Sequence, residues 1–286
     1  MVVAPHDDLG LDSLADRWRR APVVRRQGRV VGVSGTLLTA EVPGVRVGEV
    51  VNIEGVGAAE TVGFRERQAL LMPFATLDGV QHGARVDCTG EMPEAWVGDQ
   101  LKGRVIDGFG QPLDGKGPVP GLRPRPLHAA PPDALSRSLV REPLPTGVRV
   151  LDGLLTVGRG QRVGLMAGSG VGKSTLMGMI ARRSAAAVNV IALIGERGRE
   201  VREFLEDVLG PDGLRRSVVV VVTSDKSPVL QLRGAFFAMA VAEHFRDKGA
   251  DVMMMVDSVT RLAMAQRQIG LAVGEPPTTR GFTPSC

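Results

Sequence analysis

The 286-residue sequence predicts an α/β fold in which a small N-terminal β-barrel precedes a domain built on a parallel sheet. Two observations carry this prediction. From residue 29 to about residue 88, short β-rich pieces alternate with Gly, Pro and Asp at intervals of roughly 8 to 12 residues, which is typical of a small barrel. After residue 147, apolar runs alternate with helical segments, which is typical of a parallel sheet with helices on both faces.

The composition is that of an ordinary globular protein. Hydrophobic residues make up 43% of the chain and charged residues 23%, so disorder throughout is not expected. No apolar stretch approaches about 18 residues, and the N-terminus lacks the basic and then apolar order of a signal peptide. The two cysteines, Cys88 and Cys286, are too few for a disulfide framework or a zinc site, which fits a reduced, cytoplasmic compartment.

Charge and aromatic content weigh against a nucleic-acid partner. The formal net charge is +4 without a long basic run, so a polyanionic partner is allowed but not required. Aromatic residues are 3% of the chain, and the β-rich part holds only Phe64 and Phe74. Because barrels that bind oligonucleotides stack bases on aromatic side chains, this barrel is interpreted as a packing or assembly module.

Residues 1–24 are interpreted as an N-terminal helical segment. Leu11, Leu14 and Trp18 stand at positions i, i+3 and i+7 and predict one apolar stripe on a short helix. The stripe either packs against its own domain or docks on a partner or a membrane surface, since both uses give the same pattern.

Three further parts follow along the chain. Residues 25–95 are assigned to the barrel domain, 96–147 to a linker and 148–286 to the sheet domain. Turn-forming Gly and Pro dominate the linker, and its Pro-rich second half is expected to run extended over a surface without a regular element.

The sheet domain is expected to alternate strictly between strand and helix. Its apolar runs read as strands buried on both faces, and the segments between them as helices. The expected strands are 162–167, 188–195, 217–223 and 251–258, and the expected helices are 173–186, 198–209, 228–247 and 259–273.

A phosphate-binding loop lies between the first expected strand and its helix. Glycines let successive backbone N–H groups turn inward on a polyphosphate, and the helix N-terminus adds partial positive charge. Lys173 is expected to reach the β- and γ-phosphates and the Ser174 hydroxyl to ligate Mg²⁺, so ATP with Mg²⁺ is the predicted ligand.

Ala167 stands where the usual loop pattern begins with Gly. Alanine is tolerated at this position if its backbone φ is negative. The loop residues are Gly168, Ser169, Gly170, Val171, Gly172, Lys173, Ser174 and Thr175. The domain is therefore predicted to be a P-loop NTPase core with a RecA-like sheet.

Charged residues follow two other expected strands. Asp257 closes an apolar strand and is interpreted as a carboxylate for the water shell of Mg²⁺, although the same position suits a helix N-cap. Glu196 follows the strand 188–195. It either orients and deprotonates the water that attacks the γ-phosphate, or it simply stabilises the start of the next helix through the helix dipole. Arg197 either neutralises charge on the transferred phosphoryl group or pairs with Glu200.

Long motifs of the sequence carry a family resemblance. They are GRVIDGFGQPLDG, REPLPTGVRVLDGLLTVGRG, GRGQRVGLMAGSGVGKSTLMGMIAR, VNVIALIGERGREVREFLEDVLG and MMVDSVTRLAMAQRQIGLAVGEPPTTRG. These motifs resemble the flagellar protein-export ATPase of bacteria, with the ATPases of type III secretion systems as close relatives and the catalytic subunits of rotary F-type ATPases as distant ones. The resemblance covers nearly the whole chain from about residue 29. GERGREV, in place of a GERTREG-like run, favours the export branch, and within that branch we favour the flagellum.

This resemblance implies a ring-forming ATPase, a homohexamer with sites between subunits, that helps unfold and deliver export substrates with their chaperones at the secretion gate. It would be cytoplasmic and peripheral at the inner face of the membrane. The apolar stripe of its N-terminal segment would contact a stator-like regulator and acidic lipids. No nucleic-acid partner is expected. On matching positions, Glu196 would be the base, Arg197 and Arg261 phosphate-side cations, and Asp257 the magnesium carboxylate.

The sequence departs from the family pattern at two places. Gln268 stands where relatives commonly carry Glu, and the chain stops at Cys286, where relatives continue with further strands, an adenine-packing segment, an arginine finger and a C-terminal helical domain. We therefore expect a truncated chain in which nucleotide binding outlasts hydrolysis, because a finger supplied in trans contributes about 10³ to 10⁵ in rate. A nucleotide-binding assembly module without turnover and a ring-shaped nucleic-acid motor are the alternatives.

Overall fold

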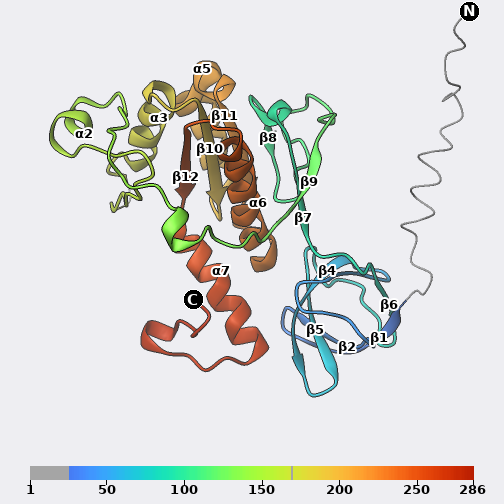
Figure 1. Ribbon diagram of the computed structural model, residues 1–286. Helices are drawn as coiled ribbons and strands as arrows, with labels where there is room; N and C mark the ends of the chain where they lie inside the picture. The colour runs from blue at the N-terminus through green and yellow to red at the C-terminus, as the bar shows by residue number, and fades with distance from the viewer. Residues whose placement is uncertain (1–25, 169) are drawn as a thin grey trace, which may run out of the picture.

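The computed structural model describes residues 26–168 and 170–286, so the expected N-terminal helical segment lies outside the described residues. Figure 1 shows the barrel in blue beside a domain of strands and helices coloured yellow to red, with β7 (Glu94–Val97) and β9 (Arg123–Pro126) between them. Within the described residues, a closed barrel precedes a parallel sheet, which confirms the predicted fold class.

The barrel is antiparallel and closes because its first strand also pairs with its last. Its interior holds fully buried apolar side chains, among them Leu38, Val51 and Val86. The strands are β1 (Gln27–Ser34), β2 (Leu37–Glu41), β3 (Val50–Ile53), β4 (Gly57–Arg65), β5 (Gln68–Pro73) and β6 (Arg85–Cys88). They follow the order β1-β2-β5-β4-β3-β6, and β6 pairs back onto β1. The punctuated β-rich pieces of the sequence thus form the expected barrel.

The stretch after the barrel holds more regular structure than its turn-forming composition predicts. β7 and β9 form a two-stranded antiparallel sheet in which Trp96 faces Pro124. Proline fits in such a pair because each strand is an edge strand and does not need every backbone donor. The expectation of no regular element in the Pro-rich half is therefore wrong at β9. Further short elements are η1 (Asp99–Leu101), β8 (Val105–Ile106) and η2 (Ala134–Ser136).

The second domain is built on a parallel sheet of order β12-β10-β11-β8. Its strands after the linker are β10 (Val188–Ile194), β11 (Ser217–Val222) and β12 (Val252–Asp257). Its helices are α2 (Arg149–Leu154), α3 (Lys173–Arg183), α4 (Gly198–Glu203), α5 (Gly210–Arg215), α6 (Pro228–Asp247) and α7 (Val259–Val273). The expected alternation of strand and helix is thus present from β10 to α7.

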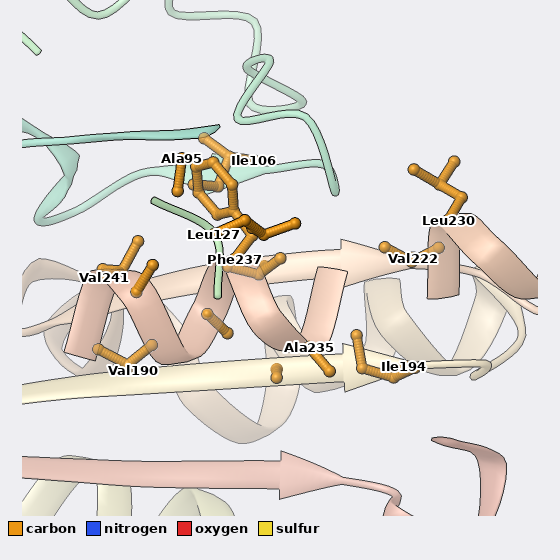
Figure 2. Close-up of a cluster of buried hydrophobic side chains, with 14 of the residues drawn as sticks. Ala95, Ile106, Leu127, Val190, Ile194, Val222, Leu230, Ala235, Phe237 and Val241 are labelled. Atoms are coloured by element: carbon orange, nitrogen blue, oxygen red, sulfur yellow. The ribbon is translucent and has the colours of Figure 1, made fainter. Parts of the chain in front are cut away.

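Successive residues of the central strands face two different cores, which explains why these strands read as continuous apolar runs. Val190 and Ile194 pack with α6, while Ile191 and Leu193 pack with α3. Figure 2 shows the α6 side, where the ring of Phe237 lies beside residues of β7 and β8. Burial on both faces makes these strands the most protected part of the fold.

Two segments differ from the expected elements. Residues 162–167 form no strand, and Val163 and Met166 are 54% and 96% exposed. A strand needs a neighbour to pair its backbone groups, and no described strand pairs with this segment. The expected helix 198–209 is α4 continued by a π-helical turn, η3 (Phe204–Leu209).

The seam between the barrel and α6 contains a buried arginine. Arg233 is 9% exposed, its Nη2 donates to the Glu94 carbonyl at 3.2 Å, and its guanidinium lies 5.1 Å from the ring centroid of Phe109. Its Nε and Nη1 atoms have no hydrogen-bond partner among the described residues. Burial raises the pKa of Glu60, on β4, to about 7, and the positive charge of Arg233 partly offsets this rise.

Helix α7 leaves the end of β12, as Figure 1 shows, and contacts β4 of the barrel. The last helical element of the described chain is the 3₁₀ turn η4 (Thr279–Gly281). None of the helices described for residues 26–168 and 170–286 is long and apolar enough to cross a bilayer.

Candidate functional site

Three chain segments bring the predicted site residues to one edge of the sheet. β10 and β12 are parallel neighbours with Leu193 opposite Asp257, so both strands end at the same edge. Asp257 is the last residue of β12, Glu196 follows β10 after one glycine, and Lys173 is the first residue of α3. Carboxyl ends of parallel strands are the usual position of ligand sites in such sheets.

These residues surround a cavity of about 490 Å³. Most of its lining comes from the Gly-rich loop with the start of α3, and from α4 with the π-helical turn that follows it. The lining residues are Ala167, Gly168, Gly170, Gly172, Lys173, Ser174, Thr175, Leu193, Glu196, Glu200, Val201, Glu203, Phe204, Val208 and Asp257. The structure therefore places the loop, Lys173, Glu196 and Asp257 around one space.

The loop has the conformation and the open surroundings that a polyphosphate requires. Gly170 and Gly172 have φ of 76° and 94°, the left-handed region that favours glycine. A Cβ atom added at Gly168, Gly170 or Gly172 would meet nothing within 4 Å, so the backbone there is free to approach a ligand. Among the described residues, positive φ outside glycine occurs only at Glu66 and Arg280, so Ala167 fits the first loop position.

Lys173 and Asp257 form an ion pair across the cavity, Nζ to Oδ1. The Asp257 side chain is 6% exposed and that of Lys173 is 30% exposed. Ser258 follows as the N-cap of α7, and its side chain accepts from the backbone N–H of Arg261 at 3.3 Å. The capping role left open for Asp257 is thus performed by Ser258, and the Asp257 carboxylate is directed to the lysine.

Glu196 lies in a cluster of charges. Burial raises its pKa to about 7, helped by a hydrogen bond to Glu200 and by the negative charges of Asp257 and Glu200, while Lys173 acts in the opposite direction. The pKa of Glu200 is lowered by its hydrogen bonds with Glu196 and Arg197. Arg197 donates from Nη1 to Glu200 Oε1 at 2.7 Å. A carboxyl with a pKa near neutrality is suited to general acid–base chemistry.

Three of the described site residues lie outside the cavity lining. The Arg197 side chain is 71% exposed and pairs with Glu200, which is the second of the two interpretations of that residue. Arg261 is exposed on the first turn of α7, and Val171 is 67% exposed. Ser169 lies outside the described residues.

The sequence interpretation missed a group of lining residues on the helix after β10. Glu200 and Glu203 supply carboxylates, and Val201, Phe204 and Val208 supply an apolar wall. The spacing of Glu200, four residues after Glu196, was an available signal because such positions share one helix face. The apolar residues also have helical spacing, but that pattern equally predicts core packing.

A parallel sheet that carries a glycine loop, a lysine at the helix start and an aspartate on a neighbouring strand defines a P-loop nucleotide-binding domain. Residues 147–286 match the family model for the nucleotide-binding domain of the ATP synthase alpha/beta family. Over these residues the chain is similar to that family, and over most of its length it resembles flagellar and type 3 secretion ATPases.

Curated relatives and solved structures confirm the resemblance found in the sequence. The flagellum-specific ATP synthase of Bacillus subtilis (strain 168) is 52% identical over 96% of this chain and 64% of its own length. The type 3 secretion system ATPase of Xanthomonas euvesicatoria is 52% identical over 92% of this chain and 61% of its own. The chain thus spans less than two thirds of these relatives.

The assembled ATPase EscN of the enteropathogenic E. coli type III secretion system matches with a TM-score of 0.85 and 45% identity, over 90% of this chain and 63% of that chain. A second structure holds EscN in complex with its central stalk, EscO, and matches with a TM-score of 0.84 over 90% of this chain and 64% of that chain.

Proposed function

We propose that this chain binds ATP with Mg²⁺ in the 490 Å³ cavity and that the protein hydrolyses ATP to drive flagellar or type III protein export. The observation that carries the nucleotide site is the Lys173–Asp257 pair at a loop with open glycine backbone. The names of the relatives support the export function and favour the flagellum or the injectisome over a nucleic-acid motor.

In this proposal different groups of the chain bind the phosphates, hold the metal and accept a proton. Backbone N–H groups of the loop hold the phosphates, and Lys173 leaves Asp257 to reach the terminal ones. The Ser174 hydroxyl and the Asp257 carboxylate are hard oxygen donors that line the same cavity and would hold Mg²⁺, directly or through water. When bound, Mg²⁺ offsets negative charge on the phosphate oxygens. Glu196 accepts a proton from the attacking water once its carboxyl is ionised. Arg197 and Arg261 remain predicted phosphate-side cations; both are exposed and lie outside the cavity lining.

The proposal extends to assembly and location. A ring of copies, a stalk-like regulator, gate proteins, export substrates with their chaperones and contact with acidic lipids at the cytoplasmic face are the partners that the family resemblance suggests. EscN has been solved both as an assembly and with its stalk, which supports a ring and a stalk partner here.

The test is equilibrium binding of ATP and Mg²⁺ to the 286-residue chain by calorimetry, together with phosphate release. Lys173→Ala removes a charged hydrogen-bond donor to phosphate, so we expect affinity to fall about 10- to 100-fold. Lys102→Ala is the matched control, because Lys102 is exposed in a turn and is not among the residues that line the cavity. Unchanged affinity in Lys173→Ala would refute the proposed site.

A further inference from the structure

The turn that carries Glu196 out of β10 is bonded to the loop that follows β11. The backbone N–H of Gly195 donates to the Val222 carbonyl at 2.7 Å, and the backbone N–H of Ser224 donates to the Glu196 carbonyl at 3.0 Å. Ser224 is exposed, so its N–H is protected from exchange by this hydrogen bond and not by burial. The position of the Glu196 backbone therefore depends on the loop of residues 223–227.

Gln231, near the start of α6, holds this loop in place. Its side-chain Nε2 donates to the Lys226 carbonyl at 3.0 Å. Gln231 also lies beside the turn itself, because a Cβ atom added at Gly195 would come within 3.2 Å of Gln231 Oε1 and 2.8 Å of the Cβ of Arg261 on α7. Gly195 has φ of 74°, in the left-handed region that favours glycine. The turn is thus enclosed by α6, α7 and the loop.

We propose that Gln231 is a positioning residue for Glu196. By holding the loop after β11, it fixes the backbone from which the Glu196 side chain reaches the cavity. Glu196 lines the cavity and Gln231 does not, so Gln231 acts on the site through these contacts. Placement matters for a base, because it must lie within about 3.2 Å of the water that it deprotonates, and a displacement of about 1 Å can lower a rate about 100-fold. This inference rests on the proposed function, in which Glu196 is the base.

The test is NMR of the nucleotide-free, 286-residue chain at a single pH, with two readouts. Gln231→Ala removes one side-chain hydrogen bond, so the loop should open more often and the Ser224 amide should exchange about 2- to 10-fold faster. The ¹³C resonance of the Glu196 side chain, assigned with Glu196→Gln, should shift because the turn is no longer held in one position.

Two further variants make these readouts specific. Gln266→Ala is the matched control, because Gln266 on α7 makes the same kind of side-chain contact, donating to Ser285 Oγ at 2.9 Å, and its loss should change neither readout. Gln231→Met keeps the length of the side chain without the donor, so it should repeat the result even if Gln231→Ala does not fold.

An unchanged Ser224 exchange rate, or an unchanged Glu196 resonance, overturns the inference. Calorimetry adds a third readout, in which the affinity of the Gln231 variants for ATP with Mg²⁺ should stay within about 2-fold of the parent. A loss as large as that expected for Lys173→Ala would mean that Gln231 supports nucleotide binding and not the base, and it also overturns the inference. Because the two NMR readouts need no nucleotide, they are independent of the Lys173→Ala binding test, and failure of one leaves the other standing.

Discussion

The buried seam between the barrel and α6 makes stability depend on pH through one carboxyl group. Burial raises the pKa of Glu60 from its ordinary value of 4.5 to about 7 in the folded chain. The folded state then holds the proton more tightly than the unfolded state. Unfolding releases a proton between these two values, so the free energy of unfolding falls as pH rises through this window.

The size of the effect follows from the difference between the pKa values of the folded and unfolded states. A pKa difference of one corresponds to about 1.4 kcal/mol, so Glu60 costs about 3 kcal/mol of stability above pH 7 and nothing below pH 4.5. This is a large fraction of the stability of an ordinary domain. Glu60→Gln keeps the shape of the side chain but cannot ionise, so the variant loses this part of the pH dependence.

Urea denaturation at pH 5 and pH 8, followed by tryptophan fluorescence, measures the difference. We expect the stability of Glu60→Gln relative to the parent to improve by about 2.5 kcal/mol between the two pH values. Glu41→Gln, an exposed barrel carboxylate, controls for the loss of one negative charge. If parent and Glu60→Gln lose or gain stability in parallel over this range, the ionisation of Glu60 is not opposed by burial and the reasoning fails.

Two further predictions concern structural positions. Asp114→Asn removes the anion of Arg104, whose side chain is 12% exposed and pairs with Asp114 Oδ2 at 2.7 Å, so stability should fall by about 3 kcal/mol in urea denaturation. A loss below about 1 kcal/mol would mean that this pair contributes no more than a surface pair. Gly172→Ala places a Cβ at a residue with φ 94° and should lower the free energy of unfolding by about 1 to 2 kcal/mol in thermal unfolding. Gly153→Ala, in helix α2 with open space around it, should not lower it. Equal effects of the two substitutions would contradict the argument from backbone strain.

Periodicity predicted best the elements whose ends carry a local signal. Helices 228–247 and 259–273 match α6 and α7, which begin after the capping side chains of Ser227 and Ser258. Residues 162–167 have the apolar pattern of a buried strand, but a strand also needs a partner, and sequence pattern carries no information on where the partner lies. β8 is a two-residue strand that depends on β11, more than a hundred residues away.

The site was predictable as a set of residues but not as a set of contacts. The loop motif and the strand ends indicated that Lys173, Glu196 and Asp257 would meet, because parallel strands share their carboxyl edge. The sequence did not indicate that Lys173 pairs with Asp257, since many acidic side chains stand at strand and helix ends. Glu200 was seen only as a surface partner of Arg197, because its place in the cavity lining depends on how α4 turns after β10.

These contacts show what a nucleotide must displace. Lys173 neutralises Asp257, whose side chain is 6% exposed, and a phosphate that takes the lysine leaves this carboxylate without its cation. An unpaired buried charge costs several kcal/mol, which opposes binding of a metal-free nucleotide. If Mg²⁺ binds with the phosphates as proposed, Asp257 would keep a positive partner after the lysine departs, and this cost would be offset. We therefore expect the chain to take up the nucleotide with its metal in preference to the metal-free nucleotide, which calorimetry with and without Mg²⁺ measures.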